Sequence, residues 1–408
     1  MNKYNIAVIG LGYVGLPLAV SIGKFFPTIG YDINKKRIKE LKSKIDSNGD
    51  CDKSDFIRSK KLFLTNDEKK LKNANIFIVA LPTPIKNRNK PDLSLINNAI
   101  IKISKYLKKE DIIIVESTVF PGYCNNIIPS LLKTKSLKLN HDYYLGYSPE
   151  RINPGDKKHK INKIDKIISG SNKKTLDLMK NIYGKITSGK IHVANTIEIA
   201  EAAKVIENSQ RDINIAFINE LSYLFHKMKI PVYEVLKAAS TKWNFLNFSP
   251  GFVGGHCVAV DPYYLAHISK SFGYNPKLLL NARKINDHFY LHIGNILKRN
   301  HKKKSKILLA GITFKEDCPD LRNSQILSLY NILKKDYNVK VYDPIVKNSK
   351  IKLVKYFKKN YFDAVVICVK HKKFIKRGPN FFKKLTKKNG KIYDLKNCFK
   401  TQKNFIKL

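Results

Sequence analysis

The chain has 408 residues, of which 77 are Lys or Arg and 32 are Asp or Glu, so its formal net charge is +45. Its 43% hydrophobic content excludes wholesale disorder, and its length predicts roughly two or three domains. Such a charge points first to nucleic acid or an anionic membrane. Only nine basic residues are Arg, however, and the 68 Lys are spread along the chain, whereas phosphate-reading proteins more often cluster Arg. We expect neither partner and keep a basic nucleic-acid-binding protein as a distant alternative.

The six cysteines are widely spaced, with no CxxC pair and no His/Cys cluster at the spacing of a zinc site. This pattern favours a reducing compartment and predicts no metal site. One uncharged run, residues 4–23, has the length of a membrane helix, but three glycines within six positions and then Pro17 make it a poor one. We therefore expect a soluble, cytoplasmic protein.

Short apolar runs alternate with amphipathic helical stretches over the first half of the chain. The runs predict buried parallel strands at Asn5–Ile9, Thr28–Tyr31, Ile76–Ala80, Ile112–Glu116 and Tyr143–Tyr147. Helical stretches such as Lys35–Lys44 and Leu93–Leu107 lie between them. This alternation is typical of a doubly wound sheet and predicts a Rossmann domain over residues 1–195.

The pattern changes near residue 197. Residues Ile197–Met228 contain no Gly or Pro and carry apolar residues at helical spacing, which predicts one long helix in a helical domain over residues 196–300. A second strand alternation, over residues 301–408, contains Ile307–Ile312, Val339–Tyr342, Ala364–Val369 and Lys391–Tyr393. The predicted fold class is α/β, with two Rossmann-like doubly wound domains joined by a long helix and a helical region.

A glycine motif, Gly10-x-Gly12-x-x-Gly15, follows the first predicted strand and opens a helix. The first glycine permits a tight turn, the second lets the backbone approach a pyrophosphate, and the third allows close packing of helix on strand. Asp32 ends the second strand, where a carboxylate would bind ribose hydroxyls and repel a 2′-phosphate. These residues predict a site for NAD.

Two threonines follow later strands of the same predicted sheet. Thr83 comes after Ile76–Ala80, and Thr118 comes after Ile112–Glu116. Because ligands of open α/β sheets gather at the carboxyl ends of strands, both would border the nicotinamide half of the site. An ordinary turn residue remains the alternative for each.

A cysteine stands in a glycine-rich segment with a carboxylate four residues later. Gly251, Gly254 and Gly255 precede Cys257, and Asp261 follows it. A thiol beside an NAD site can trap an aldehyde as a thiohemiacetal, which loses a hydride to give a thioester that water hydrolyses. A buried bystander cysteine is the alternative.

The long helix carries a cation and an amide four residues apart, Lys204 and Asn208, hence on one face. Together they suit an oxyanion that develops during hydride transfer and thioester hydrolysis. A solvated helix face is the alternative.

Over nearly its whole length the chain resembles the UDP-glucose/GDP-mannose dehydrogenase family. The motifs that carry the resemblance are GLGYVGLPLA at 10–19, PTP at 82–84, PDLS at 91–94, ESTVFPG at 116–122, GYSPERINPGD at 146–156, AEAAKVIENSQRDINIAFINEL at 200–221, PGFVGGHCVAVDPYYL at 250–265 and GITFKEDCPDLRNS at 311–324. The resemblance implies an NAD-binding Rossmann domain, a central dimerisation domain that makes a homodimer or higher homo-oligomer, and a C-terminal domain for a UDP sugar. It also implies oxidation of the sugar C6 from alcohol to acid in two NAD-dependent steps.

The resemblance further implies roles for single residues. The implied catalytic set is Cys257 as nucleophile, Lys204 and Asn208 beside the reacting carbon, Asp261 assisting proton transfer, Thr118, and Glu150 positioning or activating water. The implied NAD contacts are Tyr13, Val14, Asp32, Arg37, Thr83, Thr118 and Arg322. The implied contacts to the UDP sugar are Gly146, Tyr147, Ser148, Pro149, Glu150, Lys204, Asn208, Leu246, Asn247, Phe248, Ser249, Pro250, Gly254 and Lys315, with Arg283 reaching across a dimer.

One departure narrows the resemblance. The UDP-glucose branch of the family has a lysine three residues after its nucleophile, where this chain has Val260. The resemblance therefore favours the branch that oxidises UDP-N-acetylhexosamines for surface polysaccharides such as capsule or O-antigen, and leaves UDP-GlcNAc and UDP-GalNAc both open. A UDP-glucose or GDP-mannose 6-dehydrogenase is the alternative enzyme.

Overall fold

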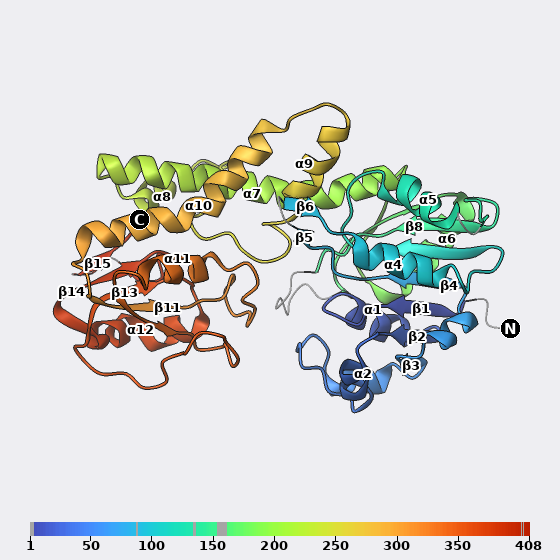
Figure 1. The fold of residues 1–408 in the computed structure, drawn as a ribbon, viewed down its shortest axis with the longest axis horizontal. Helices are drawn as coiled ribbons and strands as arrows, with labels where there is room; N and C mark the ends of the chain where they lie inside the picture. Colours follow the sequence, from blue (N-terminus) through green and yellow to red (C-terminus); the bar gives the residue numbers. More distant parts are fainter. Residues whose placement is uncertain (1–3, 87–88, 134–135, 153–160, 401, 403) are drawn as a thin grey trace. The chain divides into compact units, whose positions relative to one another are not determined.

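The computed structural model describes the chain except for residues 1–3, 87–88, 134–135, 153–160, 401 and 403. The chain divides into two compact units, residues 1–207 with 263–274 and residues 208–262 with 275–408. One long helix, α7 (Ile197–Met228), begins in the first unit and ends in the second (Figure 1). The last residues of the GYSPERINPGD motif, 153–156, lie outside the described residues.

The first unit contains an eight-stranded sheet in the order β10-β9-β8-β7-β4-β1-β2-β3. Its strands are β1 (Ile6–Ile9), β2 (Thr28–Tyr31), β3 (Leu62–Thr65), β4 (Ile76–Val79), β7 (Asp111–Val115), β8 (Tyr143–Tyr147), β9 (Lys166–Gly170) and β10 (Ile191–Val193). Its other elements are α1 (Gly15–Ile22), α2 (Lys35–Lys42), α3 (Lys53–Arg58), η1 (Glu68–Asn73), α4 (Ser94–Ile103), η3 (Tyr123–Ile127), α5 (Ile128–Lys133), α6 (Lys173–Ile186) and a small hairpin of β5 (Ile85–Lys86) and β6 (Lys90–Pro91). All neighbouring strands of the large sheet run parallel except β8 and β9.

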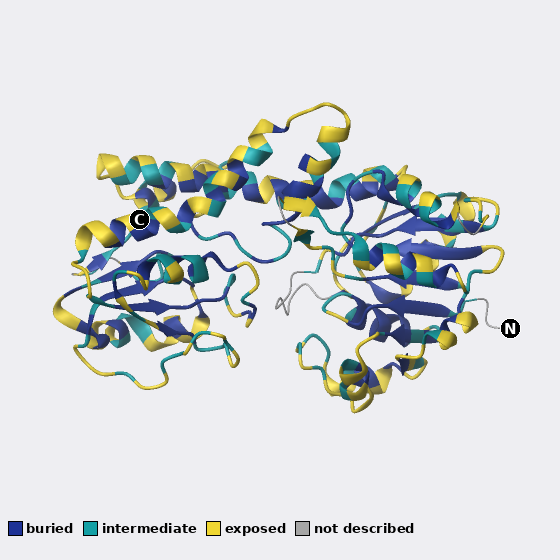
Figure 2. Ribbon diagram, viewed as in Figure 1, coloured by how far each residue is buried: buried dark blue, intermediate teal, exposed yellow. Residues whose placement is uncertain are grey.

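The central strands of this sheet are buried on both faces, as Figure 2 shows by their dark blue colour. On one face, Ile6 and Val8 of β1 belong to a core that also contains Leu16 of α1 and Ile182 of α6. Burial on both faces explains why these strands appear in the sequence as continuous apolar runs rather than as alternating ones.

The second unit contains a five-stranded, all-parallel sheet in the order β12-β11-β13-β14-β15. Its elements are β11 (Lys306–Ala310), β12 (Asn338–Tyr342), β13 (Phe362–Ile367), β14 (Thr386–Asp394), β15 (Phe405–Ile406), α8 (Val232–Ala239), α10 (Lys277–Asn300), α11 (Gln325–Leu333) and α12 (Lys372–Leu385). Helix α9 (Asp261–Ser271) begins at the end of one segment of this unit and continues in the first unit. On α10, Phe289, Ile293 and Leu297 repeat every four residues and pack into the core of this unit.

The predicted fold class is confirmed. The predicted strands of both sheets are present with ends shifted by a few residues, and α7 has the predicted ends. Strands β3, β9, β10 and β15 were not predicted, because they are short or lie beside polar residues. Among the described residues, no helix is both long and apolar enough to cross a membrane.

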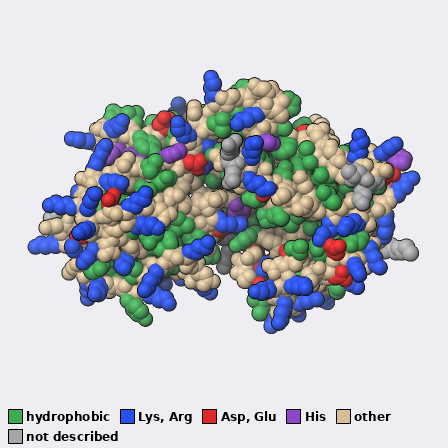
Figure 3. Space-filling view, viewed as in Figure 1, with side chains coloured by type: hydrophobic (Ala, Val, Ile, Leu, Met, Phe, Trp, Pro, Cys, Tyr) green, Lys and Arg blue, Asp and Glu red, His purple; other side chains and the backbone are tan. Residues whose placement is uncertain are grey.

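The basic residues are distributed rather than clustered. Figure 3 shows Lys and Arg side chains scattered over the visible face, with Asp and Glu among them. Many Lys side chains are solvent-exposed, which agrees with the even spread of Lys along the sequence.

We expect one buried histidine to make the stability of the second unit depend on pH. His292 of α10 packs on the Tyr223 ring with centroids 4.1 Å apart, and burial, aided by His226 and Arg299, lowers its pKa from 6.5 to about 4. The unfolded chain thus binds a proton at a higher pH than the folded chain, and this contribution to stability is lost as pH falls from 6.5 towards 4. Urea unfolding between pH 7 and 4 should show the wild type losing on the order of 2 kcal/mol more than His292→Phe. An equal loss of unfolding free energy in the wild type and in His292→Phe between pH 7 and 4 would contradict the prediction.

Candidate active site

Five strands of the first unit end on one row of paired residues. Ile9 pairs with Tyr31 on one side and with Val79 on the other, Val79 pairs with Val115, and Val115 pairs with Tyr147. The loops that follow β1, β2, β4, β7 and β8 therefore leave the sheet at one level. Every site residue predicted in the first unit, apart from Lys204 on α7, lies on or next to these five loops.

The turn after β1 contains three glycines. Packing requires Gly10 and Gly15 to be glycine, but it does not require this of Gly12. Gly10 has φ +92°, and a Cβ there would lie 2.7 Å from the carbonyl oxygen of Ala80. A Cβ at Gly15 would lie 1.8 Å from the carbonyl oxygen of Gly10, whereas one at Gly12 would meet nothing within 4 Å. Gly12 therefore keeps an open approach to the backbone, which fits a pyrophosphate at the start of α1.

Asp32 is held in place by the same turn. Its Oδ2 accepts a hydrogen bond from the Leu11 N–H at 2.9 Å, and its Oδ1 accepts one from the Asn34 N–H at 2.8 Å. Each carboxylate oxygen keeps a second lone pair, so the group can still accept hydrogen bonds from ribose hydroxyls. The backbone contacts fix its orientation before any ligand binds.

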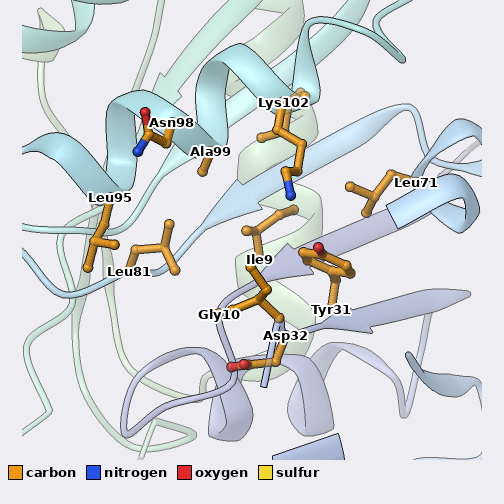
Figure 4. Close-up of a pocket in the computed structure, with 12 residues that line it drawn as sticks. Ile9, Gly10, Tyr31, Asp32, Leu71, Leu81, Leu95, Asn98, Ala99 and Lys102 are labelled. Atoms are coloured by element: carbon orange, nitrogen blue, oxygen red, sulfur yellow. The ribbon is translucent and has the colours of Figure 1, made fainter. Parts of the chain in front are cut away.

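A pocket of about 220 Å³ opens beside Asp32 (Figure 4). It is bordered by the ends of β1 and β2, by η1 and by one face of α4, and its lining residues are Ile9, Gly10, Tyr31, Asp32, Ile33, Leu71, Leu81, Leu95, Asn98, Ala99, Lys102 and Ile103. Mostly apolar walls with one carboxylate at the rim suit an adenosine group. The α4 wall was not predicted from the sequence, because Leu95, Ala99 and Ile103 have the spacing of an ordinary core-facing stripe.

Arg37, a predicted NAD contact, supports the glycine turn. Its Nε donates to the Leu11 carbonyl oxygen at 3.1 Å, and its two terminal nitrogens pair with Glu40 at 3.0 Å and Asp46 at 2.8 Å. The guanidinium is thus adjacent to the turn, with two carboxylates compensating its charge. Tyr13 and Val14 lie between Gly12 and Gly15 and are half-buried.

The loops after β4 and β7 are tied to each other and to α9. The Ser117 Oγ accepts from the Leu81 N–H at 2.8 Å, which joins the two loops. The Tyr264 hydroxyl, one turn into α9, donates to the Thr83 carbonyl oxygen at 2.7 Å. These bonds fix the backbone beside Thr83 and beside the half-buried Thr118, both predicted at the nicotinamide end.

The loop after β7 is also held by α7. Glu201 is fully buried and accepts from the N–H groups of Gly122 at 2.6 Å and Cys124 at 2.9 Å. Burial raises the pKa of Glu201 to about 7. Lys204, predicted to be catalytic, follows one turn later and is 8% exposed.

A buried charge cluster underlies the loops after β7 and β8. Lys166, the first residue of β9, is fully buried, and its Nζ lies 2.8 Å from Glu116 Oε2 and 3.8 Å from Glu150 Oε2. The Tyr183 hydroxyl donates to Glu116 Oε1 at 2.5 Å. Burial raises the pKa of Glu116, although Lys166 lowers it in part. Lys166 was not predicted as a site residue, because nothing in the sequence distinguishes it from the other lysines.

The predicted substrate segment 146–150 is buried in this unit. Gly146 and Tyr147 form the end of β8, and a Cβ at Gly146 would lie 2.4 Å from the sulfur of Met179. The Tyr147 hydroxyl donates to the Ser117 carbonyl oxygen at 3.3 Å. Ser148, Pro149 and Glu150 follow at the row where the strands end, and all three are buried.

In the second unit, Cys257 stands one turn before α9. Its carbonyl oxygen accepts from the N–H groups of Val260 at 2.9 Å and Asp261 at 2.8 Å, and the residue is half-buried. These two bonds join the backbone of Cys257 to the first turn of α9. The neighbouring His256 is also half-buried.

Close packing explains the glycines before the cysteine. A Cβ at Gly254 would lie 2.6 Å from the Asn323 carbonyl oxygen, and one at Gly255, where φ is +82°, would lie 2.7 Å from the ring of Phe314. The Gly255 N–H donates to the Arg322 carbonyl oxygen at 3.1 Å, and the Asn323 amide donates back to Gly255 at 2.9 Å. The glycines thus bring the Cys257 segment onto the 311–324 segment, which contains Lys315 and Arg322.

Asn208 and Asp261, two of the predicted site residues, contact each other. The Asn208 Nδ2 donates to Asp261 Oδ2 at 2.6 Å, and Asp261 is 2% exposed. Lys204 and Asn208 lie one turn apart on α7. The contact therefore places a helix amide against the carboxylate that follows the cysteine by one turn.

The other predicted NAD and UDP-sugar contacts in the second unit differ in solvent exposure. Arg322 is exposed, and its guanidinium is bound by Asp320 at 2.5 and 2.9 Å, whereas Lys315 is half-buried. Of the predicted segment 246–250, Leu246 is 60% exposed and Pro250 is buried; Asn247, Phe248 and Ser249 lie between them.

Arg283 lies in a buried network rather than on the surface. It is 1% exposed, its guanidinium pairs with Asp212 of α7 at 2.5 Å, and it also contacts Asp287. The Asn286 amide donates to the same Asp212 and accepts from Asn219, whose side chain in turn holds the backbone of Gly251. In this chain Arg283 therefore supports the packing of α10 on α7.

The glycine turn offers a matched pair of substitutions. Gly12→Ala meets no atom of the protein, so its melting temperature should stay within about 2 °C of the wild type, while its methyl group blocks the approach to the backbone and weakens NAD binding about tenfold or more. Gly15→Ala drives a methyl group into the Gly10 carbonyl and should lower the free energy of unfolding by about 2 kcal/mol or more. Calorimetric titration with NAD and urea unfolding measure the two effects. Equal losses of NAD affinity and of unfolding free energy in the two variants would contradict the assignment of Gly12 to NAD binding and of Gly15 to packing.

Comparison with known proteins covers nearly the whole chain. The NAD binding domain of the UDP-glucose/GDP-mannose dehydrogenase family matches residues 4–187, its central domain matches residues 198–288, and its UDP binding domain matches residues 308–401.

Named relatives agree in length and fold. The chain is 43% identical to a UDP-N-acetyl-D-glucosamine 6-dehydrogenase of Pseudomonas aeruginosa, covering 100% of both chains, and 40% identical to one of Salmonella typhi, covering 100% of this chain and 99% of the relative. The structure of a UDP-D-ManNAc dehydrogenase from Pyrococcus horikoshii superposes with a TM-score of 0.88 at 31% identity, covering 99% of this chain and 98% of that one. The predictions of a nucleotide-sugar dehydrogenase and of NAD as its cofactor are confirmed. The chain belongs to the UDP-glucose/GDP-mannose dehydrogenase family.

Proposed function

We propose that this protein oxidises C6 of a UDP-N-acetylhexosamine from alcohol to carboxylic acid, with NAD as the oxidant, to supply a precursor of surface polysaccharide. The observation that carries the proposal is Cys257, which stands one turn before α9 and before its first residue, Asp261, which binds Asn208. A two-electron alcohol dehydrogenase needs no thiol, whereas a thiol gives oxidation to the acid a route through a thiohemiacetal and a thioester. The names of the two bacterial relatives support a UDP-N-acetylhexosamine as the sugar.

The first oxidation converts the C6 alcohol to an aldehyde by loss of a hydride and a proton. Bound NAD supplies the hydride acceptor in this oxidation and in the next. Lys204 and Asn208 would stabilise the negative charge on the C6 oxygen, and Asp261, held by Asn208 at 2.6 Å, would take up the proton directly or through water.

The second oxidation passes through the cysteine. The Cys257 thiolate adds to the aldehyde carbon, and the oxygen takes a proton to give a thiohemiacetal. Loss of a hydride and a proton gives a thioester. Water then adds to the thioester carbon, Glu150 takes the proton of that water, and the C–S bond breaks to release the acid and the Cys257 thiolate. Two hydrides leave the sugar for each molecule of acid.

The same proposal assigns the binding residues. The NAD residues are Gly10, Gly12, Tyr13, Val14, Gly15, Asp32, Arg37, Thr83, Thr118 and Arg322, with the α4 wall of the pocket beside the adenosine. The UDP-sugar residues are Gly146, Tyr147, Ser148, Pro149, Glu150, Leu246, Asn247, Phe248, Ser249, Pro250, Gly254 and Lys315, together with Lys204 and Asn208. We propose the three domains at residues 1–195, 196–300 and 301–408 as the NAD-binding, dimerisation and UDP-sugar-binding domains.

We also propose that α7 pairs with a second copy of the chain. Five large apolar residues on this helix are each between 49% and 55% exposed: Ile199, Ile206, Phe217, Leu224 and Met228. They are spaced by seven, eleven, seven and four residues, which places all five on one face of a helix with 3.6 residues per turn. The buried polar residues Glu201, Lys204, Asp212 and Asn219 lie roughly opposite. A continuous exposed apolar stripe of this length is typical of a subunit interface.

We place the protein in the cytoplasm, because a thiol nucleophile and a nucleotide sugar both belong to a reducing, nucleotide-containing compartment. Recovery of the activity with the membrane or periplasmic fraction of the native cell, rather than with the cytosol, would contradict this placement.

The stoichiometry of the reaction tests the proposed chemistry. The purified protein should form two NADH per sugar consumed and release a uronic acid, because C6 loses two hydrides. Absorbance at the NADH band together with chromatography of the sugar gives both numbers. One NADH with free aldehyde, or no turnover on any nucleotide sugar, would refute the proposal.

A panel of substrates tests the sugar specificity. UDP-GlcNAc, UDP-GalNAc and UDP-ManNAc should each be compared with UDP-glucose and GDP-mannose by kcat/KM. We expect one of the N-acetylated sugars to exceed UDP-glucose and GDP-mannose by about tenfold or more. A preference for UDP-glucose or GDP-mannose would favour the alternative enzyme.

Removal of the thiol should abolish acid formation. Cys257→Ala cannot form the thioester, and the rate of acid formation should fall by about a thousandfold or more. Cys398→Ala, which removes another half-buried thiol of the same unit, is the matched control and should retain activity. Acid formation by Cys257→Ala at the wild-type rate would rule out the nucleophile.

A charge on the apolar stripe should separate the subunits. Phe217→Lys places an ammonium in the middle of the proposed interface, whereas Phe272→Lys changes an aromatic residue that is 82% exposed and outside the stripe. Sedimentation analysis should show a dimer or larger assembly for the wild type and Phe272→Lys, and a weaker assembly, by about tenfold or more in Kd, for Phe217→Lys. A monomeric wild type would overturn the proposal.

A further inference from the structure

We infer that Lys166 is a positioning residue for the hydrolysis of the thioester: its buried ammonium ties the segment after β8 that contains Glu150 to the loop that begins at Glu116, and so orients the carboxylate that receives the proton of water. The inference rests on the proposed function, because it concerns the last step of that reaction. Lys166 itself would touch neither substrate nor cofactor.

The geometry places Lys166 between the two loops. Its Nζ lies 2.8 Å from Glu116 Oε2, 3.4 Å from the Pro149 carbonyl oxygen and 3.8 Å from Glu150 Oε2. Glu116 directly follows β7 and comes two residues before Thr118, while Pro149 and Glu150 follow β8. One cation on β9 therefore contacts both loops where the two parallel strands end.

The orientation of Glu150 depends on this cation. Its Oε1 accepts from the N–H groups of Arg151 at 2.6 Å and Ile152 at 2.5 Å, so one oxygen is held by its own turn. The other oxygen faces Lys166. Among the polar contacts of the described residues, the ammonium is the one that reaches the carboxylate from outside its own turn, so without it only the two local N–H groups would orient the carboxylate.

The cost of burying these charges argues that the arrangement has a use beyond folding. Lys166 and Glu116 have fully buried side chains, and the Glu150 side chain is 6% exposed. Placing an ion in a protein interior costs several kcal/mol, and an apolar pair of similar volume is often as stable or more stable. Two carboxylates around a single ammonium also leave one negative charge uncompensated by it.

Losing Lys166 should slow the hydrolysis of the thioester, because that step requires a proton to leave water. Water must lose a proton as its oxygen bonds to the thioester carbon, and the C–S bond then breaks to regenerate the Cys257 thiolate. Without Lys166, Glu116 and Glu150 repel each other, and Glu150 turns away from the position in which it receives the proton of water. Proton transfer from water then slows, and the thioester on Cys257 persists.

The test compares Lys166→Met with the wild type during turnover. We expect kcat to fall about tenfold or more, because misplacing a reacting group by about 1 Å has effects of up to a hundredfold. The KM values for NAD and the UDP sugar should stay within about threefold. Mass spectrometry of acid-quenched protein should show a larger fraction of Cys257 carrying the acyl group than in the wild type. A lysine with a merely structural role would not change this fraction.

Two further variants separate positioning from charge neutralisation. Glu116→Gln/Lys166→Met removes one buried charge of each sign, so it should regain a melting temperature within about 2 °C of the wild type. It still lacks the contact to Glu150 and should still accumulate the acyl-enzyme. Lys174→Met, which removes an exposed lysine paired with Glu110, is the control and should behave as the wild type.

Three results would overturn the proposed role of Lys166. Wild-type turnover and no acyl-enzyme accumulation in the double variant would show that Lys166 only neutralises Glu116, and would overturn it. Unchanged kcat in Lys166→Met would do the same. A wild type that oxidises no UDP sugar would instead refute the proposed function, and the inference would fall with it.

Discussion

The positions of the candidate site residues in the first unit depend on the register of five parallel strands. Ile9, Tyr31, Val79, Val115 and Tyr147 pair across the first sheet, so that the strands end together. Because the strands are buried on both faces, a slip of one residue would expose apolar side chains and bury loop backbone, which makes the register energetically strict. The glycine turn, Asp32, the threonine loops and Glu150 all take their positions from this row. Their chemistry is thus set by the packing of a core that contains none of them.

Helix α7 reverses the usual distribution of polar and apolar residues. It buries Glu201, Lys204, Asp212 and Asn219, and it exposes a row of large apolar side chains. A surface helix normally shows the opposite pattern. The buried polar face is accounted for by contacts with the loop after β7, with α10 and with the backbone of Gly251. The exposed apolar face is the surface proposed above to pair with a second subunit. One helix thereby links the proposed site to the proposed dimer.

Most of the residues that make up the net charge of +45 play no part in the candidate site. Most lysines are exposed and solvated, where an ion pair is worth at most about 1 kcal/mol. The charges with consequences are single, and they are buried or half-buried. Lys166 faces two carboxylates, Arg283 faces Asp212, and Arg37 is held between Glu40 and Asp46 beside the glycine turn. In a low-dielectric interior each of these groups needs a partner, so each fixes the position of the elements that supply one.

The sequence by itself determined the α/β fold, the ends of α7, the glycine turn with Asp32, and Cys257 with Asp261, because these features depend on local periodicity or on residues close together in the chain. Only the tertiary structure decided which partners the buried charges and the buried hydroxyl of Tyr264 have. Lys166 is 50 positions from Glu116, Arg283 is 71 from Asp212, and Tyr264 is 181 from Thr83. No local pattern encodes such contacts, since a lysine or arginine in the sequence looks the same whether it is solvated or buried. The fold alone brings the two carboxylates to one lysine, and for that reason the role of Lys166 was invisible until the strands were placed side by side.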